Sequence, residues 1–228
     1  MAGNRKLGLW QPAVHPIDQM PTQMPTQKPT QKPASQPTAL HTEGAIKIRP
    51  LESDDLSDVV KFCDLNIGKN YYSSPEMKQI FEKSQSNGVM CSFVLWDKEA
   101  IVGVRLTYAP GQWTKGKGSG IHPELWSVPA ERVGYFQSLF VSDNYQGGGW
   151  GRRLSNVSVE ALKSLGTQAI VTHSWKESPN NSSQRYLTNM GFKYVATHPL
   201  YWKDIDYVCT YDDKPCQCTA EEMILYLA

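Results

Sequence analysis

Residues 146–153, Gln-Gly-Gly-Gly-Trp-Gly-Arg-Arg, join an almost continuously apolar run (residues 133–142) to an amphipathic one (residues 150–165). The first run is typical of a buried strand, and the second has the apolar spacing of a helix. At the start of a helix the first amide N–H groups lack partners, and the helix dipole adds partial positive charge. Because glycines leave these amides uncovered, the segment predicts a binding site for a phosphate or pyrophosphate.

Two common phosphate-binding motifs do not match this segment. A P-loop requires Gly-Lys followed by Ser or Thr, whereas residues 151–153 are Gly-Arg-Arg. The dinucleotide fingerprint requires a third glycine where this chain has Leu154, and an acidic residue where the next strand ends in His173 or Ser174. A different phosphate ligand is therefore expected, and Arg152 in the first helical turn could add a charge-assisted contact to it.

A third motif does match. Residues 146–151 follow the pattern Gln/Arg-x-x-Gly-x-Gly/Ala after an apolar strand. This resembles the acetyl-CoA-binding motif of the GCN5-related N-acetyltransferase (GNAT) superfamily. Asn180, eleven residues before Gly191-Phe192, is similar to the asparagine of the family's Asn…Gly-Phe helix. The order of the expected elements from residue 45 onward matches as well, so the resemblance covers residues 45–228.

The expected elements form one domain behind a tail. Residues 45–228 predict a strand, two helices, three strands, a helix, a strand, a helix and final strands, with a short helix over 219–223 as an alternative. This order indicates an α/β (α+β mixed) fold. The resemblance implies a GNAT-like central sheet, mixed but mostly antiparallel, of about six to seven strands flanked by about four helices. Residues 1–42, rich in Pro, Thr and Gln, are expected to be a disordered tail.

The resemblance also implies how acetyl-CoA would bind. The amides of residues 147–152 would bind its pyrophosphate, the strand main chain would pair with its pantetheine arm, and Asn180 would contact it from the following helix. The strand over 133–142 and the next strand, 168–174, would splay apart to admit the thioester. The cofactor-binding residues expected are Leu139, Val141, Gln146, Gly147, Gly148, Gly149, Trp150, Gly151, Arg152 and Asn180.

The acid and the base depart from the family's pattern. The usual acid is a tyrosine four residues before the Gly-Phe glycine, where this chain has Leu187. Tyr186 lies one residue earlier, and a helix turns about 100° per residue, so Tyr186 is expected to be a core aromatic, with the acid as an alternative role. The strand before the motif has no carboxylate or histidine, and its polar members include Gln137 and Ser138. His173 is the candidate base, with a strand-end histidine that has no catalytic role as the alternative. The other catalytic candidates are Tyr186 and, acting through water, Tyr135 and Glu131.

Composition excludes several other classes of protein. The formal net charge is +1, which predicts no nucleic-acid-binding surface, and no apolar run is long enough to cross a bilayer. The N-terminus lacks the apolar core of a signal peptide, so a cytoplasmic monomer or homodimer is expected. Three thiols near the C-terminus, Cys209, Cys216 and Cys218, could bind zinc together with a histidine such as His198 or His173. Their spacing differs from that of usual structural zinc sites, so no metal site is expected.

The sequence thus predicts an N-acetyltransferase that transfers the acetyl group of acetyl-CoA to a primary amine of a small molecule or peptide by direct attack in a ternary complex. Two alternatives stay open. One is a non-catalytic acyl-CoA-binding or regulatory module on the same fold, and the other is a metal- or redox-sensing protein. The glycine-rich segment 111–132, with Trp113, His122 and Trp126, is expected to wall the acceptor side together with the two N-terminal helices.

Overall fold

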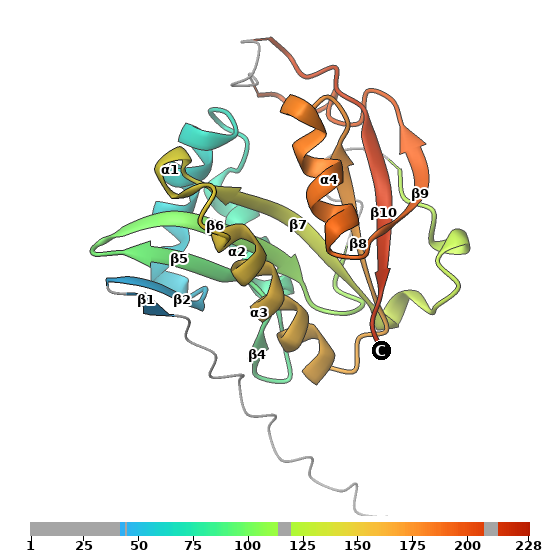
Figure 1. Cartoon of the computed structure of the whole chain (residues 1–228), viewed down its shortest axis with the longest axis horizontal. Coiled ribbons are helices and arrows are strands. Elements are labelled where there is room, and N and C mark those ends of the chain that lie inside the picture. The colour runs from blue at the N-terminus through green and yellow to red at the C-terminus, as the bar shows by residue number, and fades with distance from the viewer. Residues whose placement is uncertain (1–41, 44, 114–119, 208–213) are drawn as a thin grey trace, which may run out of the picture. The chain divides into compact units, whose positions relative to one another are not determined.

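The computed structural model describes residues 42–43, 45–113, 120–207 and 214–228. Its main sheet has eight strands in the order β1-β2-β5-β6-β7-β8-β10-β9, of which β1 is a two-residue edge strand (Figure 1). All neighbouring strands are antiparallel except β7 and β8, which are parallel. Together with four α-helices, this sheet confirms the predicted mixed, mostly antiparallel α/β fold.

The strands of the main sheet are β1 (Thr42–Glu43), β2 (Ile46–Pro50), β5 (Phe93–Asp97), β6 (Ala100–Tyr108), β7 (Val133–Val141), β8 (Ala169–Trp175), β9 (Lys193–His198) and β10 (Ala220–Tyr226). The helices are α1 (Leu56–Asn66), α2 (Ser74–Lys83), α3 (Trp150–Ser164) and α4 (Ser182–Asn189). Two short strands, β3 (Gln85–Ser86) and β4 (Val89–Met90), form a separate hairpin.

The helices cover opposite faces of the sheet in pairs. Leu154 and Leu162 of α3, with Leu187 of α4, bury their side chains in one core cluster. Val59 of α1 and Met77 of α2 belong to the other. Figure 1 shows α3 and α4 on the same side of the strands. The sheet therefore has an α3/α4 face and an α1/α2 face, each with its own apolar core.

Two C-terminal elements differ from the expectation. The helix expected from residue 178 onward begins as a 3-10 turn, and α4 starts only at Ser182. Asn180 and Asn181 have positive φ angles of 52°, a left-handed conformation that asparagine tolerates better than most residues and that interrupts a helix. Residues 219–223, the alternative short helix, belong instead to β10 from Ala220 onward.

Strands β7 and β8 pair over only part of their length. The parallel register runs from Val133 opposite Ala169 to Phe136 opposite Thr172. At that end the Thr172 hydroxyl donates to the Phe136 carbonyl over 2.9 Å. Beyond it the strands diverge, as Figure 1 shows. We call this opening, between residues 137–141 of β7 and residues 173–175 of β8, the fork. It is the splaying of the two strands that the resemblance predicted.

A β-bulge in β7 lies at the same level. In the register with β6, Leu106 faces Ser138 and Thr107 faces Phe136, which leaves Gln137 as the extra residue. A bulge bends its strand and turns two successive side chains toward one face. Gln137 and Ser138 accordingly both contact Tyr72, which lies between α1 and α2. The bulge thus presents polar groups at the mouth of the fork on the α1/α2 face.

The α1/α2 face is rich in buried tyrosines, which predicts a pH limit for the fold. Burial raises the pKa of Tyr108 to about 12 and raises the pKa of Tyr71, Tyr72, Tyr135 and Tyr201 above the ordinary value of 10. Above pH 10 the unfolded chain therefore binds fewer protons than the folded one, so the free energy of unfolding falls as pH rises. Each such tyrosine contributes up to about 1.4 kcal/mol per pH unit.

Unfolding by urea at a series of pH values tests this expectation. The midpoint should fall steeply between about pH 10 and 12, and tyrosinate absorbance should rise together with loss of structure. If these tyrosines ionised near pH 10 in a chain that stays folded, the buried arrangement of the α1/α2 face would be wrong.

Candidate active site

The glycine segment exposes the N-terminus of α3. Gly147 and Gly149 have positive φ angles of 79° and 77°, and a Cβ at either position would meet nothing within 4 Å. Gly149 is the N-cap of α3 and supplies no side-chain cap. The Gln146 side chain donates to the Val141 carbonyl (3.0 Å) and to Asp143 (2.9 Å), which fixes the turn after β7. The first amides of a long helix are therefore left uncapped beside open space, the arrangement that favours an anion.

The residues that follow the glycines have separate tasks. Trp150 is buried against the sheet, in the same core cluster as Leu154. Arg153 stacks its guanidinium over the Trp150 ring, 4.5 Å from its centroid. Arg152 is exposed and donates to the carbonyl of Asn189 at the end of α4 (3.2 Å). Of the two arginines, Arg152 is the one whose charge is more available to a phosphate bound at the helix start.

The edge of β7 that borders the fork is available for main-chain pairing. Leu139 and Val141 pair with Arg105 and Gly103 of β6 on one side, while the described ladder with β8 has already ended on the other. Asn180 lies just after β8, in the 3-10 turn before α4. The predicted cofactor residues thus come from both sides of the fork, although Asn180 precedes the helix on which it was expected.

Tyr186 connects the two helices of the α3/α4 face. Its hydroxyl lies 2.6 Å from Ser155 Oγ and 3.1 Å from the Gly151 carbonyl, both in the first turns of α3. Arg105, whose pKa burial lowers, donates to the same Ser155 hydroxyl over 2.7 Å. Tyr186 is therefore more than a core aromatic, because its polar end reaches the start of α3. Leu187, at the family's tyrosine position, is buried in the apolar core.

His173 lies where β8 leaves the ladder, on the α1/α2 face. Its Nδ1 is 2.7 Å from the Tyr135 hydroxyl and 3.1 Å from the Tyr201 hydroxyl, and its ring stacks on Tyr201 at 4.2 Å. Burial, reinforced by the charge of His198, lowers the pKa of His173 to about 3, against an opposing effect of the Gly120 carbonyl. The ring is therefore neutral at neutral pH. Its Nε2 atom is buried and makes no hydrogen bond of good geometry among the described residues.

Glu222 is a site residue that the sequence did not reveal, and His198, considered from the sequence only as a partner of the C-terminal cysteines, lies beside it. Glu222 is fully buried in β10 and lies opposite His173 in the register. It accepts hydrogen bonds from Trp126 Nε1 (2.6 Å) and from the His122 main-chain N–H (3.1 Å), and its Oε2 is 2.9 Å from His198 Nε2. Only the pairing of β8, β10 and β9 brings these side chains together.

The bulge places another buried polar atom, Gln137 Oε1, at the fork. Gln137 donates from Nε2 to the Tyr72 hydroxyl (3.2 Å), which also contacts Ser138 Oγ (2.7 Å). Its Oε1 atom is buried without a hydrogen-bond partner in the part of the chain that the structure describes. Gln137 Oε1 is thus a buried acceptor at the fork, and His173 Nε2 is a buried ring nitrogen whose role as donor or acceptor depends on the tautomer. Buried acceptors of this kind are costly unless a donor, such as a substrate N–H, completes them.

The family follows from a comparison with known proteins. The model of the Acetyltransferase (GNAT) family matches residues 57–192, more than half of the chain. This chain belongs to the GNAT acetyltransferase family. The matched region includes the fork, the glycine segment and α4, so the two motifs that carried the resemblance lie within it. No curated protein sequence matches the chain.

Solved structures share the fold of this GNAT domain. The NatC complex bound to Gag peptide and CoA aligns with a TM-score of 0.57 and 16% identity, over 80% of this chain and 99% of that one. The ribosomal-protein-S18-alanine N-acetyltransferase from Escherichia coli aligns with 0.56 and 14%, over 80% and 94%. An agmatine N-acetyltransferase aligns with 0.55 and 11%, over 81% and 100%. At these identities the likeness establishes the fold.

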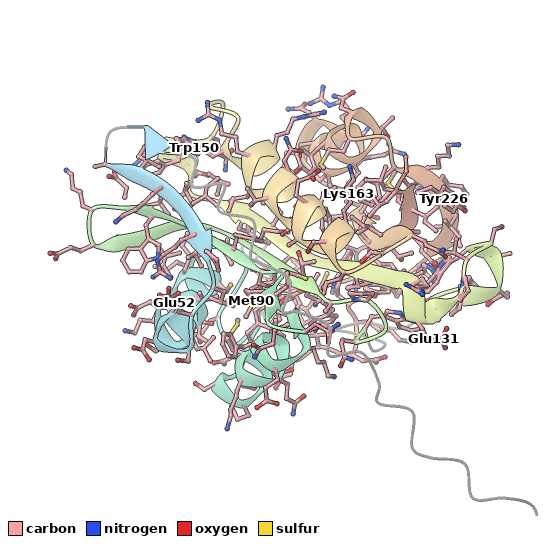
Figure 2. The ribbon with its side chains drawn as sticks, turned by 90° about the horizontal axis from the view of Figure 1, so that it is seen from below. Glu52, Met90, Glu131, Trp150, Lys163 and Tyr226 are labelled. Atoms are coloured by element: carbon pink, nitrogen blue, oxygen red, sulfur yellow. The ribbon has the colours of Figure 1, made fainter. Side chains whose placement is uncertain are left out.

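One predicted catalytic residue, Glu131, lies away from the fork of the GNAT domain. Glu131 is exposed in a 3-10 turn before β7, and Figure 2 shows it far from Trp150. Trp113 packs edge-on against Trp126 at 5.1 Å within the core of the α1/α2 face. Residues 1–41, 114–119 and Cys209 lie outside the described residues. No helix in the described part of the chain is long and apolar enough to span a membrane.

Proposed function

We propose that this GNAT domain is an active enzyme that transfers the acetyl group of acetyl-CoA to a primary amine of a small molecule or peptide. The observation that carries the proposal is the fork, which opens directly beside the uncapped start of α3. An anion bound at that helix and a chain laid along β7 would bring a thioester to the bulge at Gln137. Acetyl-CoA has this combination of pyrophosphate, extended arm and thioester.

The cofactor would occupy the α3/α4 side. Amides of residues 147–152 would bind the pyrophosphate, with Arg152 adding charge, and the free edge of β7 at Leu139 and Val141 would pair with the pantetheine arm. The residues proposed to contact it are those predicted from the sequence, Asn180 included. The Tyr186 hydroxyl is held by Ser155 and the Gly151 carbonyl at the start of α3, so it would have to leave these partners to protonate the departing thiolate.

The amine would enter from the α1/α2 side. Gln137 Oε1, which is buried at the fork and has no partner among the described residues, can accept an N–H of the amine and hold the nitrogen lone pair toward the thioester carbon. His173 and Tyr135 border the same place. Main-chain N–H groups of the bulged strand are suited to stabilise the oxyanion that forms. The neutral amine attacks the thioester carbon directly, a C–N bond forms and the C–S bond breaks, CoA leaves as the thiolate, and the nitrogen loses one proton to water. Positioning supplies much of the rate.

Both peptides and small amines are suitable acceptors to test. Among the structural neighbours, one is named for an alanine of a ribosomal protein, one holds a peptide, and one is named for agmatine. A panel of peptide N-termini, lysine peptides, arylalkylamines and polyamines, each mixed with acetyl-CoA, tests the proposal through release of the CoA thiol. At least one class should accelerate release well above the rate without amine.

The competing proposal of a non-catalytic acyl-CoA-binding module makes the opposite prediction. Such a module would bind acetyl-CoA but release no thiol with any amine and would not hydrolyse the thioester slowly. Binding measured by calorimetry alongside the thiol assay separates the two. A thiol-dependent response without acetyl transfer would instead favour a redox-sensing role for Cys216 and Cys218, of which the first is buried and the second partly exposed.

A further inference from the structure

Three side chains that commonly bind metals meet on the α1/α2 face. They are His173 of β8, His198 at the end of β9 and Glu222 of β10, and their ligand atoms lie within 4.8 Å of one another. His173 is the cross-strand partner of Glu222, and His198 is the partner of Ala220, two residues before Glu222. Because residues i and i+2 of a strand point to the same face, the sheet register itself holds the three groups together.

The atoms that face away from this group already have partners. Glu222 Oε1 accepts from Trp126 Nε1 (2.6 Å), and the His122 main-chain N–H reaches both oxygens (3.2 and 3.1 Å). His173 Nδ1 contacts the hydroxyls of Tyr135 and Tyr201. Metal-binding histidines and carboxylates typically show this arrangement, in which outer hydrogen bonds fix the ring or carboxylate and leave one atom for the ion.

One ring nitrogen of the three side chains is short of partners. His173 Nε2 is buried and has no hydrogen bond of good geometry among the described residues. Glu222 Oε2 is 2.9 Å from His198 Nε2, a separation that two ligands of one ion also adopt. Gly120 packs on the His198 ring so closely that a Cβ there would lie 2.5 Å from Nδ1, which keeps the ring in place. A buried carboxylate is costly without a compensating positive charge, which either a protonated His198 or an ion held between the two side chains would supply.

We propose that His173, His198 and Glu222 bind a divalent transition-metal ion, with Zn²⁺ as the preferred ion. Two imidazoles and one carboxylate are a known donor set for zinc, and three protein ligands leave a fourth position open, as in catalytic rather than structural zinc sites. The open position lies beside the fork on the acceptor side. This assigns His173 the role of a ligand instead of a proton acceptor. Metal binding itself does not depend on the proposed acetyl transfer. Only the placement of the open coordination position beside the amine acceptor rests on that proposed function.

Metal binding can be measured without any assay of turnover. The full chain is dialysed against chelator, then titrated with Zn²⁺ by calorimetry and with Co²⁺ by visible absorption. One equivalent should bind, and Co²⁺ should give the absorption of a tetrahedral or five-coordinate site. The substitutions Glu222→Gln and His198→Gln should each weaken Zn²⁺ binding by more than the roughly 10- to 100-fold that loss of an outer partner costs.

Glu221→Gln is the matched control. Glu221 is the preceding residue, but its carboxylate faces the other side of the sheet, where it bonds Gln184 (2.8 Å) and lies 3.7 Å from Lys176. This variant should bind one Zn²⁺ as tightly as the unaltered chain. Circular dichroism in chelator checks the fold of each variant, and His173→Gln provides a third ligand variant if one of the others does not fold.

Two outcomes would overturn the inference. One is an unaltered chain that takes up neither Zn²⁺ nor Co²⁺, which would leave His198 and Glu222 as a hydrogen-bonded pair. The other is binding that persists in folded Glu222→Gln and His198→Gln variants. Neither outcome bears on acetyl transfer, since the titrations contain no acetyl-CoA and no amine. A failure of the amine panel would likewise leave metal binding intact.

Discussion

Replacing Gly149 by alanine is expected to weaken CoA binding at least tenfold, about 1.4 kcal/mol. Gly149 caps α3 with a φ of 77°, and its missing Cβ leaves open space beside the first amides of the helix. An alanine methyl group would stand in the space through which the pyrophosphate approaches, and the positive φ would disfavour the turn that aims those amides. Calorimetric titration of each variant with CoA gives the affinities.

Gly88→Ala is the control for backbone strain. Gly88, in the turn between β3 and β4, has the same φ of 77°, and a Cβ there would also meet nothing within 4 Å. Both substitutions should therefore lower the free energy of unfolding by similar amounts, about 1–2 kcal/mol, which is the conformational cost of alanine in the left-handed region. Only the Gly149 variant should lose CoA affinity. Equal losses of affinity in both variants would show that strain, and not close approach, explains the glycines.

Replacing Gln137 by methionine is expected to lower kcat/KM for the amine about 10- to 100-fold without destabilising the fold. The first effect follows because the variant lacks the buried Oε1 acceptor at the fork. Positive charge develops on the amine nitrogen as it attacks, and a hydrogen bond to a charged group is worth about 1.5–3 kcal/mol. The second follows because removing a buried oxygen that has no partner in the described part of the chain offsets the lost bond to Tyr72. Affinity for CoA alone should not change.

Thr167→Val provides the matched comparison. The Thr167 hydroxyl is also buried without a partner among the described residues, but it lies before β8, at the opposite end of that strand from the fork. Its removal should leave kcat/KM unchanged. If the Gln137 variant kept full activity, or if both variants lost activity together with stability, Gln137 would have no contact with the acceptor.

The parts of the site that local sequence determines were predictable. The glycines, the apolar strand before them and the helical face after them are adjacent in the chain, so their types and spacing specify an anion site at the start of α3. The same holds for β7, whose almost continuously apolar run indicated a buried central strand. These predictions needed only the conformational freedom of glycine and the periodicity of the apolar residues.

The other half of the site depends on long-range register, which one sequence does not display. Glu222 lies in a stretch whose Thr-Ala-Glu-Glu-Met composition also suits a helix, and only pairing with β8 sets it opposite His173. The unusual position of Gln137 depends on the bulge against β6. Asn180 was placed on a helix although asparagine is among the residues that most often adopt the left-handed conformation found there, because that tendency alone does not locate a helix start.

The direct test of the account follows an isotopically labelled acetyl group through a single turnover. The chain, in excess over labelled acetyl-CoA, is mixed with the amine that the panel selects and quenched at intervals for mass spectrometry. The account predicts that label passes from CoA to the amine while the protein mass stays unlabelled, because attack is direct. Labelled protein formed before labelled amine, or label that stays on bound acetyl-CoA with every amine, would contradict it.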